Sequence, residues 1–365
     1  TISYLPDFLL DCFDLEREEL RSRFFGAKEA FVSRVIKTYL GKTAVITLPL
    51  FACEIFSSPE KLNQEVARAI EKAAEMKVKG LSFAGVLPSA LKYCQRIEGE
   101  ERYPHIAMTS GHATTVAAVS LNFDKAVKDF RIDVEEEELS VLGLGSIGQA
   151  SLALLLAKGY HPRAIKLCDL GSKLDVLEAL AKEIRSDFSY GGRVSILPFK
   201  DEIPQQIYQS RLILAATTAP RILDIDKLKT MTIVVDDSGP HCFDVSKAKR
   251  RMERESDIAC IQAGCLRLPQ RMEQTSYLPI SVTSQLSDEK LLELTHFSER
   301  TITSCVLSGI LTAKGEGPVT KGLPKLAPCL RWRDLLKSQE IDAPDFVLAA
   351  APLPRTVQKT LVRRR

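Results

Sequence analysis

The feature that most constrains the fold of this chain is a glycine-rich turn at residues 143–148, which reads G-L-G-S-I-G. An apolar segment with the composition of a strand precedes the turn at 140–144, and a segment with helical spacing follows it at 147–158. A G-x-G-x-x-G turn has a structural meaning only between a strand and a helix. Because both neighbours are present, the pattern predicts the first strand–turn–helix unit of a dinucleotide-binding fold.

Each glycine of this turn has its own role in such a fold. Gly143 permits the tight turn, Gly145 allows the backbone to approach a pyrophosphate, and Gly148 allows the helix to lie close to the strand. Ser146 and Ile147 stand at the start of the helix, where backbone amides and the helix dipole attract an anion. We therefore predict that these five residues hold the pyrophosphate of a dinucleotide.

A series of short apolar segments surrounds this turn and continues beyond it, separated by segments of helical length. Strands in this rhythm predict an α/β fold with a doubly wound parallel sheet of the Rossmann type. The predicted strands cover 140–144, 164–169, 193–197, 212–216, 232–236 and 258–262.

The chain before the turn alternates helical and strand patterns, which predicts a first α/β domain over residues 1–132. An acidic run at 133–138 marks the passage into a dinucleotide-binding domain at 133–287. In the first domain we expect an amphipathic helix within 15–40, strands at 43–50, 81–87 and 105–109, a helix from Ser58 to 79, and a helix reaching residue 130.

The remaining residues, 288–365, are predicted to form a C-terminal helix and a tail that pack on the first domain. A long helix is expected from Asp288 towards Gly315, with Cys305 in its middle. Its apolar residues would be Leu291, Leu292, Leu294, Phe297 and Ile302. A further short helix is expected at 332–336.

Charge and composition argue against several classes of protein. Lys and Arg number 50 against 47 Asp and Glu, and a net charge of +3 does not favour a nucleic-acid binder. No apolar run is long enough to span a bilayer, and the acidic start lacks the pattern of a signal peptide, so we expect a cytoplasmic protein. The nine cysteines include no CxxC pair, so we expect free, mostly buried thiols and no metal site.

Polar residues at the ends of the predicted strands extend the cofactor site. Asp169 ends the second strand, about twenty residues after the glycines, where a carboxylate accepts hydrogen bonds from the adenosine ribose. This favours NADH, while Arg163 or Lys173, either of which could receive a 2′-phosphate, leaves NADPH open. Thr217 and Thr218 follow the fourth strand and Asp237 follows the fifth, at the edge where open sheets bind ligands. Both loops are also compatible with ordinary turns.

Five segments match one family by pattern. They are TSGHATTVAAV at 109–119, VLGLGSIGQA at 141–150, LAATTAP at 214–220, VVDDSGP at 234–240 and TSCVLSGIL at 303–311. In these segments the chain resembles the long-chain acyl-(acyl-carrier-protein) reductases of the cyanobacterial type, whose dehydrogenase core is similar to that of glutamyl-tRNA reductase. The first and last segments carry most of the specificity, because the glycine-rich turn is common to many dehydrogenases.

The resemblance implies a two-step reduction. In that family a cysteine on a late helix takes the acyl group from a carrier-protein thioester, and the matching position here is Cys305. Hydride from NADH or NADPH then releases an aldehyde. Since a cysteine in mid-helix gains little from the helix N-terminus, His112 or His241 is expected to favour its thiolate. The family uses NADPH and has asparagine at the position of His112.

The resemblance also implies a partner, an acyl carrier protein bearing the acyl thioester. Such carriers are acidic in most known cases, so the basic run at 247–251 is a candidate docking face, although solvated helices carry such runs as well. Phe83, Val86 and Leu87 are candidates for the wall of an acyl tunnel, or for plain core.

Two other classes remain open on the sequence. One is a different NAD(P)-dependent dehydrogenase that acts on an aminoacyl or small keto substrate, with Cys305 in a structural role. The other is a non-catalytic nucleotide-binding module that reports the state of its cofactor to a partner.

Overall fold

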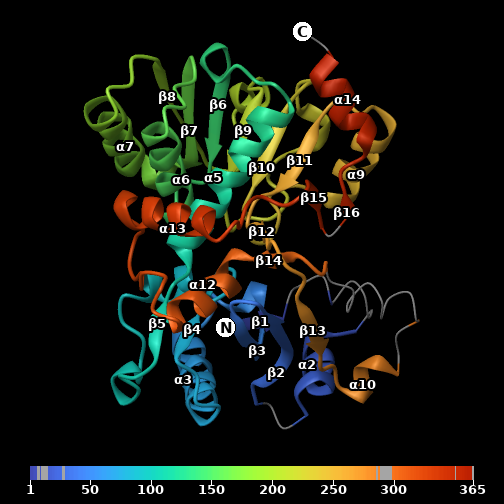
Figure 1. Ribbon diagram of the computed structural model, residues 1–365. Coiled ribbons are helices and arrows are strands. Elements are labelled where there is room, and N and C mark those ends of the chain that lie inside the picture. Colours follow the sequence, from blue (N-terminus) through green and yellow to red (C-terminus); the bar gives the residue numbers. More distant parts are fainter. Residues whose placement is uncertain are drawn as a thin grey trace. The chain divides into compact units, whose positions relative to one another are not determined.

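A computed structural model describes the chain at residues 1–5, 9, 15–26, 29–284, 287, 298–349 and 351–363. The chain divides into two compact units (Figure 1). Unit 1 comprises residues 1–114 and 268–323, and unit 2 comprises residues 115–267 and 324–365.

Unit 2 is built on a six-stranded parallel sheet with the order β11-β10-β9-β6-β7-β8 (Figure 1). The order reverses between β6 and β9, as it does in a doubly wound Rossmann sheet. The predicted α/β fold class is confirmed, and each predicted strand is present at nearly the same residues. The strands are β6 (Glu138–Leu142), β7 (Ala164–Leu170), β8 (Arg193–Phe199), β9 (Leu212–Ala215), β10 (Ile233–Asp236) and β11 (Ala259–Gln262).

Helices pack around this sheet and bury a continuous apolar core. The strands are nearly all apolar, as expected where a parallel sheet is covered on both faces. Helix α7 packs on β7 and β8, while α13 packs on α6 and α14 packs on α9. The helices and remaining short strands are α5 (His112–Asp129), which begins in unit 1, α6 (Ser146–Ala157), α7 (Leu174–Asp187), α8 (Gln205–Tyr208), α9 (Val245–Arg254), α13 (Leu326–Ser338), α14 (Arg355–Arg363), β12 (Cys265–Arg267), β15 (Val347–Leu348) and β16 (Ala351–Pro352).

Unit 1 contains a mixed sheet of order β1-β3-β2-β13, in which only β1 and β3 run parallel, and a separate parallel pair of β4 and β5. Helix α3 begins as predicted, with the Ser58 hydroxyl accepting from the Lys61 amide and Pro59 at the first position. The elements are β1 (Ile2–Leu5), α2 (Arg17–Phe25), β2 (Phe31–Thr38), β3 (Gly41–Phe51), α3 (Pro59–Glu75), β4 (Gly80–Ser82), α4 (Leu87–Ala90), β5 (Ala107–Thr109), β13 (Glu273–Ser276), α10 (Ile280–Thr283), β14 (Thr301–Thr303) and α12 (Ser304–Ala313).

Two local predictions for unit 1 are wrong. The expected helix at 15–40 is a shorter helix, α2, followed by strand β2, because β-branched residues from Phe31 onward pair with β3 through a tight connection at residues 39–40. The expected strand at 81–87 ends at Ser82, because Gly85 takes a φ of +57° that breaks the extended backbone.

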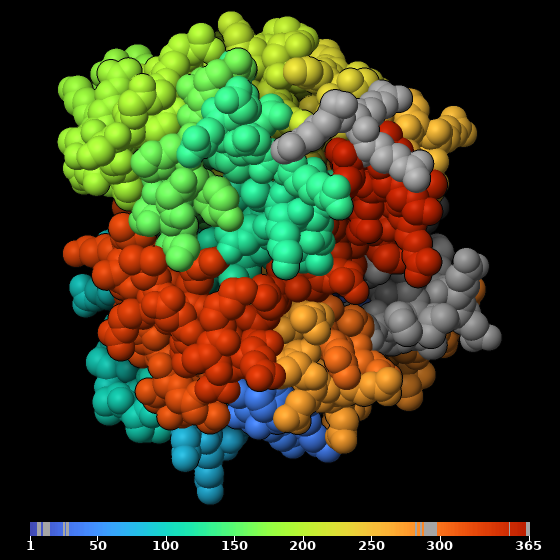
Figure 2. Space-filling view, turned by 45° about the horizontal axis from the view of Figure 1, so that its top comes forward, coloured from blue at the N-terminus to red at the C-terminus, as the bar shows by residue number. Residues whose placement is uncertain are grey.

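The C-terminal segment also differs from the prediction. Residues from 324 onward belong to unit 2 and not to the first domain, because their large apolar side chains find their core there. Trp332 is fully buried, and Phe346 stacks on Phe130 with 5.3 Å between ring centroids. In Figure 2 the red atoms of this segment lie against blue-green atoms of the same unit.

The late helix is also shorter than expected. Its predicted first residue Asp288 and its residues Leu291, Leu292, Leu294 and Phe297 lie outside the described residues. Ile302, predicted in the same helix, is in strand β14, and helix α12 begins only at Ser304.

Candidate functional site

The glycine-rich turn of unit 2 leaves no room for a side chain at two of its glycines. Gly143 has a φ of +85°, and a β-carbon there would lie 2.5 Å from the carbonyl oxygen of Ala216. A β-carbon at Gly148 would overlap the carbonyl oxygen of Gly143. The turn is also tied to β7, since the Gly143 amide donates to the Cys168 carbonyl at 2.9 Å. These contacts bring the start of α6 against the sheet.

The second glycine of the turn, Gly145, faces open space. Gly145 precedes α6, and a β-carbon there would meet nothing within 4 Å. Ser146, the first residue of α6, is buried, and Ile147 packs on the core. The first amides of a helix have no carbonyl partner within the helix and attract anions. The open side of Gly145 therefore fits the pyrophosphate of a dinucleotide, as predicted for this turn.

Asp169 lies at the carboxyl end of β7 and binds the same turn. Its Oδ2 accepts from the Leu144 amide at 2.7 Å and from the Lys173 ammonium at 2.9 Å, and its Oδ1 accepts from the Leu170 amide at 2.7 Å. The sequence placed Asp169 correctly beside the turn. Its bond to the turn and its ion pair with Lys173 are additional findings, because neither follows from spacing alone.

The cofactor preference of the protein is expected to depend on this ion pair. We predict that Asp169→Ser shifts the preference from NADH towards NADPH, because the carboxylate no longer repels a 2′-phosphate and Lys173 becomes free to bind it. One charge-assisted bond corresponds to about 1.5–3 kcal/mol, or roughly ten- to a hundredfold in affinity. The measurement is the ratio of the dissociation constants for NADH and NADPH. The ratio is used because loss of the hydrogen bond from the Leu144 amide is expected to weaken the binding of both cofactors.

The matched control adds Lys173→Gln to Asp169→Ser. The double variant is expected to lose the gain in NADPH affinity, since the cation that would bind the phosphate is absent. An unaltered protein that already prefers NADPH would contradict the role given to Asp169.

The loops after β9 and β10 are joined at the same edge of the sheet. The Thr217 amide donates to the Ser238 hydroxyl at 3.1 Å, and the Gly239 amide donates to the Thr217 carbonyl at 3.2 Å. Thr218 is exposed beside them. Burial and the neighbouring Asp236 carboxylate raise the pKa of Asp237 well above its ordinary value. Thr217 and Asp237 therefore belong to one structured edge of the sheet.

Cys305 of unit 1 lies in the first turn of α12, so its predicted place in the middle of a helix is wrong. Residues 301–303 are extended in β14, and Thr303 is the N-cap of the helix. The Cys305 thiol is partly exposed and donates to the Thr303 hydroxyl at 3.5 Å. A cysteine in the first turn lies in the positive field of the helix N-terminus, which favours a thiolate. A histidine is not required for that effect.

The turn that precedes α5 packs directly against this cysteine. A β-carbon at Gly111, where φ is +76°, would lie 3.5 Å from the Cα of Cys305. The Thr320 amide donates to the Thr109 hydroxyl at 3.2 Å, and the Ser110 amide donates to the Thr320 carbonyl at 2.8 Å. These bonds hold the turn in place. The turn at 109–112 and the start of α12 thus meet at Cys305.

His112, the next residue, is buried in unit 1. Its ring contacts the edge of Tyr93 at 6.1 Å between centroids, and burial lowers the pKa of His112 to about 4. The side chain is therefore a neutral imidazole at pH 7. His112 therefore lacks the positive charge that would favour the Cys305 thiolate, and this part of the prediction for His112 is wrong.

The buried imidazole makes stability depend on pH. The unfolded chain binds a proton at His112 below pH ~6.5, whereas the folded chain does so only near pH 4. The free energy of unfolding is therefore expected to decrease as the pH is lowered from ~6.5 to about 4. The expected loss is about 2–3 kcal/mol, which urea denaturation at pH 7 and pH ~4.5 would measure. His112→Gln should lose this contribution, while His105→Gln, at an exposed position, should keep it. Equal losses in all three proteins would contradict the prediction.

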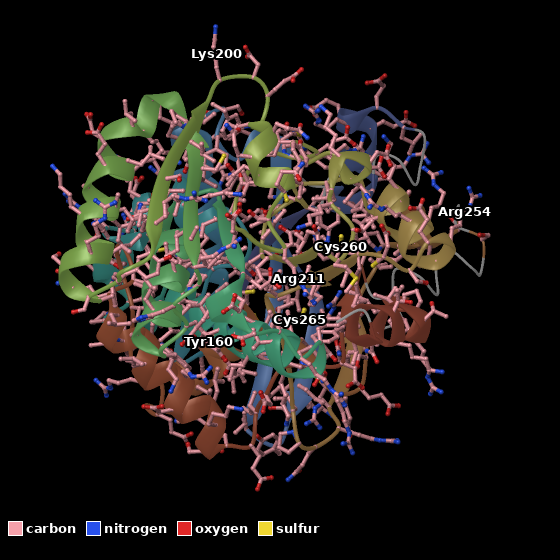
Figure 3. All side chains as sticks on the ribbon, turned by 90° about the horizontal axis from the view of Figure 1, so that it is seen from above. Tyr160, Lys200, Arg211, Arg254, Cys260 and Cys265 are labelled. Carbon is pink, nitrogen blue, oxygen red and sulfur yellow. The ribbon has the colours of Figure 1, made fainter. Side chains whose placement is uncertain are left out.

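The other cysteines of the described residues are poor nucleophiles, with one exception. Among the described residues only Cys53 is exposed, and Cys94, Cys168, Cys242, Cys260, Cys265 and Cys329 are buried. Burial raises the pKa of Cys94, Cys168 and Cys329 to about 12, and that of Cys242 and Cys260 well above the ordinary value. Cys260 and Cys265 are labelled in Figure 3. Burial therefore leaves Cys305 and Cys53 as the accessible thiols of the described chain.

The basic run at 247–251 is only partly a surface feature. It lies in α9, where Ala248 is buried and Arg251 turns inward, donating to Asp257 at 2.8 Å and to the carbonyl of Leu228 at 2.9 Å. Arg250 and Arg254 are exposed, and Figure 3 shows Arg254 at the outer edge of the molecule. The sequence could not separate Arg251 from its neighbours, because its acidic partner follows after the helix ends.

Three further expectations concern tunnels, membranes and metals. Phe83, Val86 and Leu87 are part of the hydrophobic core of unit 1. No helix in the described part of the chain is long and apolar enough to cross a membrane. The same residues contain no group of three or more side chains suited to hold a metal ion.

The fold and the site together define an α/β chain with the geometry of a dinucleotide-binding Rossmann protein and, in its other unit, a partly exposed cysteine at a helix start. No family model matches the chain, and no curated protein matches it significantly. Several solved structures are similar to the chain at low sequence identity.

The Δ1-pyrroline-2-carboxylate reductase of Thermococcus litoralis, solved with NADH and L-proline, is 11% identical over 34% of this chain and 36% of that one, with a TM-score of 0.27. The chain thus matches about a third of that reductase. L-Tryptophan dehydrogenase from Nostoc punctiforme is 13% identical over 99% of this chain and 86% of that one, with a TM-score of 0.39. Aspartate transcarbamoylase from Trypanosoma cruzi is 13% identical over 65% and 70%, with a TM-score of 0.28. Similarities this weak carry no argument about function, which must be argued from the geometry of the site.

Proposed function

We propose that this protein is an NAD(P)H-dependent reductase that transfers an acyl group from an acyl-carrier-protein thioester to Cys305 and releases it as an aldehyde. The observation that carries the proposal is the position of Cys305 in the first turn of α12, partly exposed and packed against the turn before α5. Of the five segments in which the chain resembles acyl-carrier-protein reductases, these are the two that carry most of the specificity.

The cofactor part of the proposal rests on unit 2. Gly145 leaves open the space that a pyrophosphate needs, and Asp169 lies where the adenosine ribose would bind. When bound, the nicotinamide cofactor supplies hydride. The chain's own contribution is to hold the pyrophosphate at the start of α6 and to place the two halves of the cofactor on opposite sides of the reversal between β6 and β9.

The acyl-transfer part rests on the chemistry of the thiol. The Cys305 thiolate attacks the carbonyl carbon of the thioester, a bond from sulfur to carbon forms, and the carrier's thiolate leaves with its electron pair. The helix N-terminus stabilises the attacking thiolate, and Thr303 Oγ1, 3.5 Å from the sulfur, helps to orient it.

The proposed partner is an acidic acyl carrier protein. The exposed face of α9, which carries Arg250 and Arg254, is the proposed docking surface. Arg251 is excluded from that role, because Asp257 and the Leu228 carbonyl hold its guanidinium inward.

Incubation of the purified protein with a long-chain acyl thioester of an acyl carrier protein tests the proposal. Without cofactor, intact mass should increase by one acyl group, and addition of NADH or NADPH should remove the adduct and release aldehyde. Cofactor binding without an adduct or aldehyde would favour a dehydrogenase for another substrate. Cofactor binding without reduction of any carbonyl compound would favour a non-catalytic module.

A further inference from the structure

A buried carboxylate and a histidine form a close pair at the edge of the Rossmann sheet. Asp236 is the last residue of β10 and is fully buried, and its Oδ2 lies 2.6 Å from the Nδ1 atom of His241. The sequence identified His241 as a candidate catalytic residue, but it did not indicate that Asp236 is the partner of His241. A distance this short indicates a strong, charge-assisted hydrogen bond.

Other contacts fix both members of the pair. Asp236 Oδ1 accepts from the Ser238 amide at 3.1 Å and from the Cys242 thiol at 3.5 Å, so its carboxylate cannot rotate freely. The His241 ring stacks on Phe243, with centroids 5.5 Å apart and an angle of 25° between the planes. The imidazole is therefore held at one nitrogen and on one face.

The hydrogen-bonding pattern also determines what the imidazole offers to a ligand. Because an ionised carboxylate only accepts, Nδ1 must donate to Asp236, and Nε2 remains to accept or give a proton. Within the described part of the chain Nε2 has no hydrogen-bond partner, and the His241 side chain is 21% exposed. The ring is thus prepared to exchange a proton with a bound molecule and with solvent.

The position of the pair matches the reacting half of the cofactor. In a Rossmann sheet the adenosine half lies towards β7, where Asp169 is, and the nicotinamide half lies beyond the strand reversal, towards β9 and β10. Asp236 ends β10, and the adjoining Ser238 and Gly239 are bonded to Thr217 after β9. The pair is therefore on the nicotinamide side of the sheet edge.

We propose that His241 is the acid for the oxygen of the carbonyl group that the nicotinamide cofactor reduces, and that Asp236 is the positioning residue that holds its ring with Nε2 available. This inference rests on the proposed function. When hydride adds to the carbonyl carbon, the carbonyl π electrons move to oxygen, and the protonated ring of His241 gives that oxygen the proton of Nε2. The ring is left neutral, with its remaining proton on Nδ1, and takes up the second proton again from solvent.

The protonation site of His241 can be measured without any substrate. The chain contains only five histidines, so long-range ¹H–¹⁵N NMR of the ¹⁵N-histidine-labelled full chain is readily assigned with His241→Gln. At a pH where the ring is neutral, we expect the proton on Nδ1. In Asp236→Asn the amide can donate to Nδ1, so the proton should move to Nε2. A proton on Nε2 in the unaltered protein would overturn the pair.

Activity tests the role of the histidine itself. His241→Gln leaves the backbone bonds of its loop intact, and we expect hydride transfer to an acyl–Cys305 adduct to slow by roughly 10²-fold or more with unchanged NADH affinity. His161→Gln is the matched control, because His161 lies in the connection that precedes β7, at the other end of the parallel strands, and contacts Tyr190 there. Asp236→Asn should slow the same step, also without loss of NADH binding.

The possible outcomes separate the two proposals. Full activity in His241→Gln, in a preparation whose unaltered protein reduces the adduct, would overturn the role of His241 and leave the proposed function standing. Absence of both adduct and aldehyde in the unaltered protein would overturn the proposed function, and the acid role would fall with it. Slow hydride transfer in His241→Gln and Asp236→Asn, with normal transfer in His161→Gln, supports the inference.

Discussion

Cys305→Ser is expected to abolish the covalent acyl adduct while leaving the fold and NADH binding unchanged. Serine occupies nearly the same volume, but its hydroxyl is far less acidic than a thiol, so the helix N-terminus cannot hold it as an anion. The binding of dinucleotide is expected to survive, because the glycine-rich turn lies in unit 2 and Cys305 lies in unit 1. Intact mass after incubation with the acyl thioester, followed by peptide mapping, is the measurement.

Cys53→Ser provides the matched control for this experiment. Cys53 is the other accessible thiol of the described chain, but it lies in a short turn after β3 and not at the start of a long helix. We expect its variant to retain the full adduct. An adduct located on Cys53, or full reductase activity in Cys305→Ser, would contradict the assignment and would favour hydride transfer to the bound thioester directly.

The parallel sheet was predictable from the sequence because it is buried on both faces. Its strands are short apolar runs between helices of regular length, so periodicity alone locates them. Unit 1 was less predictable, because its sheet is mixed. Strand β2 is mostly half-buried, and its residues 31–38 resemble an amphipathic helix until their pairing with β3 is known. Long-range pairing of this kind decides the conformation of a half-buried segment.

The sequence contains an N-cap pattern at the start of α12, although the spacing of the apolar residues before it suggested a longer helix. Thr303 and Ser304 directly precede the apolar run, and such residues are typical of an N-cap. Extending the helix backwards through Ile302 placed Cys305 in its middle and suggested that a histidine was needed. The structure shows a strand up to Thr303, so the helix itself supplies the positive field.

The electrostatic partners of the site residues were beyond a single sequence. Burial of His112 and the inward turn of Arg251 depend on the packing of distant segments. Asp236 and His241 are only five residues apart, yet their contact requires a loop that bends back on the end of β10. Spacing identified the residue types at the sheet edge, whereas their pairing is a property of the folded loop.

Two glycines of the turn at 143–148 are expected to respond differently to the same small change. Gly148→Ala should lower the melting temperature and weaken NADH binding together, because its new methyl group would overlap the Gly143 carbonyl oxygen. Gly145→Ala should keep the melting temperature, since a β-carbon there meets nothing within 4 Å in the protein. The two variants thus separate damage to the fold from damage to the binding surface.

Gly145→Ala is nevertheless expected to weaken dinucleotide binding strongly. The space that its methyl group would fill is the space through which a pyrophosphate reaches the first amides of α6. Crowding a close contact by one methyl group costs about 1–3 kcal/mol, which corresponds to roughly a ten- to hundredfold higher dissociation constant for NADH. Calorimetric or fluorescence titration alongside thermal unfolding measures both quantities on one preparation. Unchanged affinity in Gly145→Ala would mean that the dinucleotide does not bind at this turn. The protein itself leaves room for a β-carbon at Gly145, so only a bound dinucleotide would require glycine there.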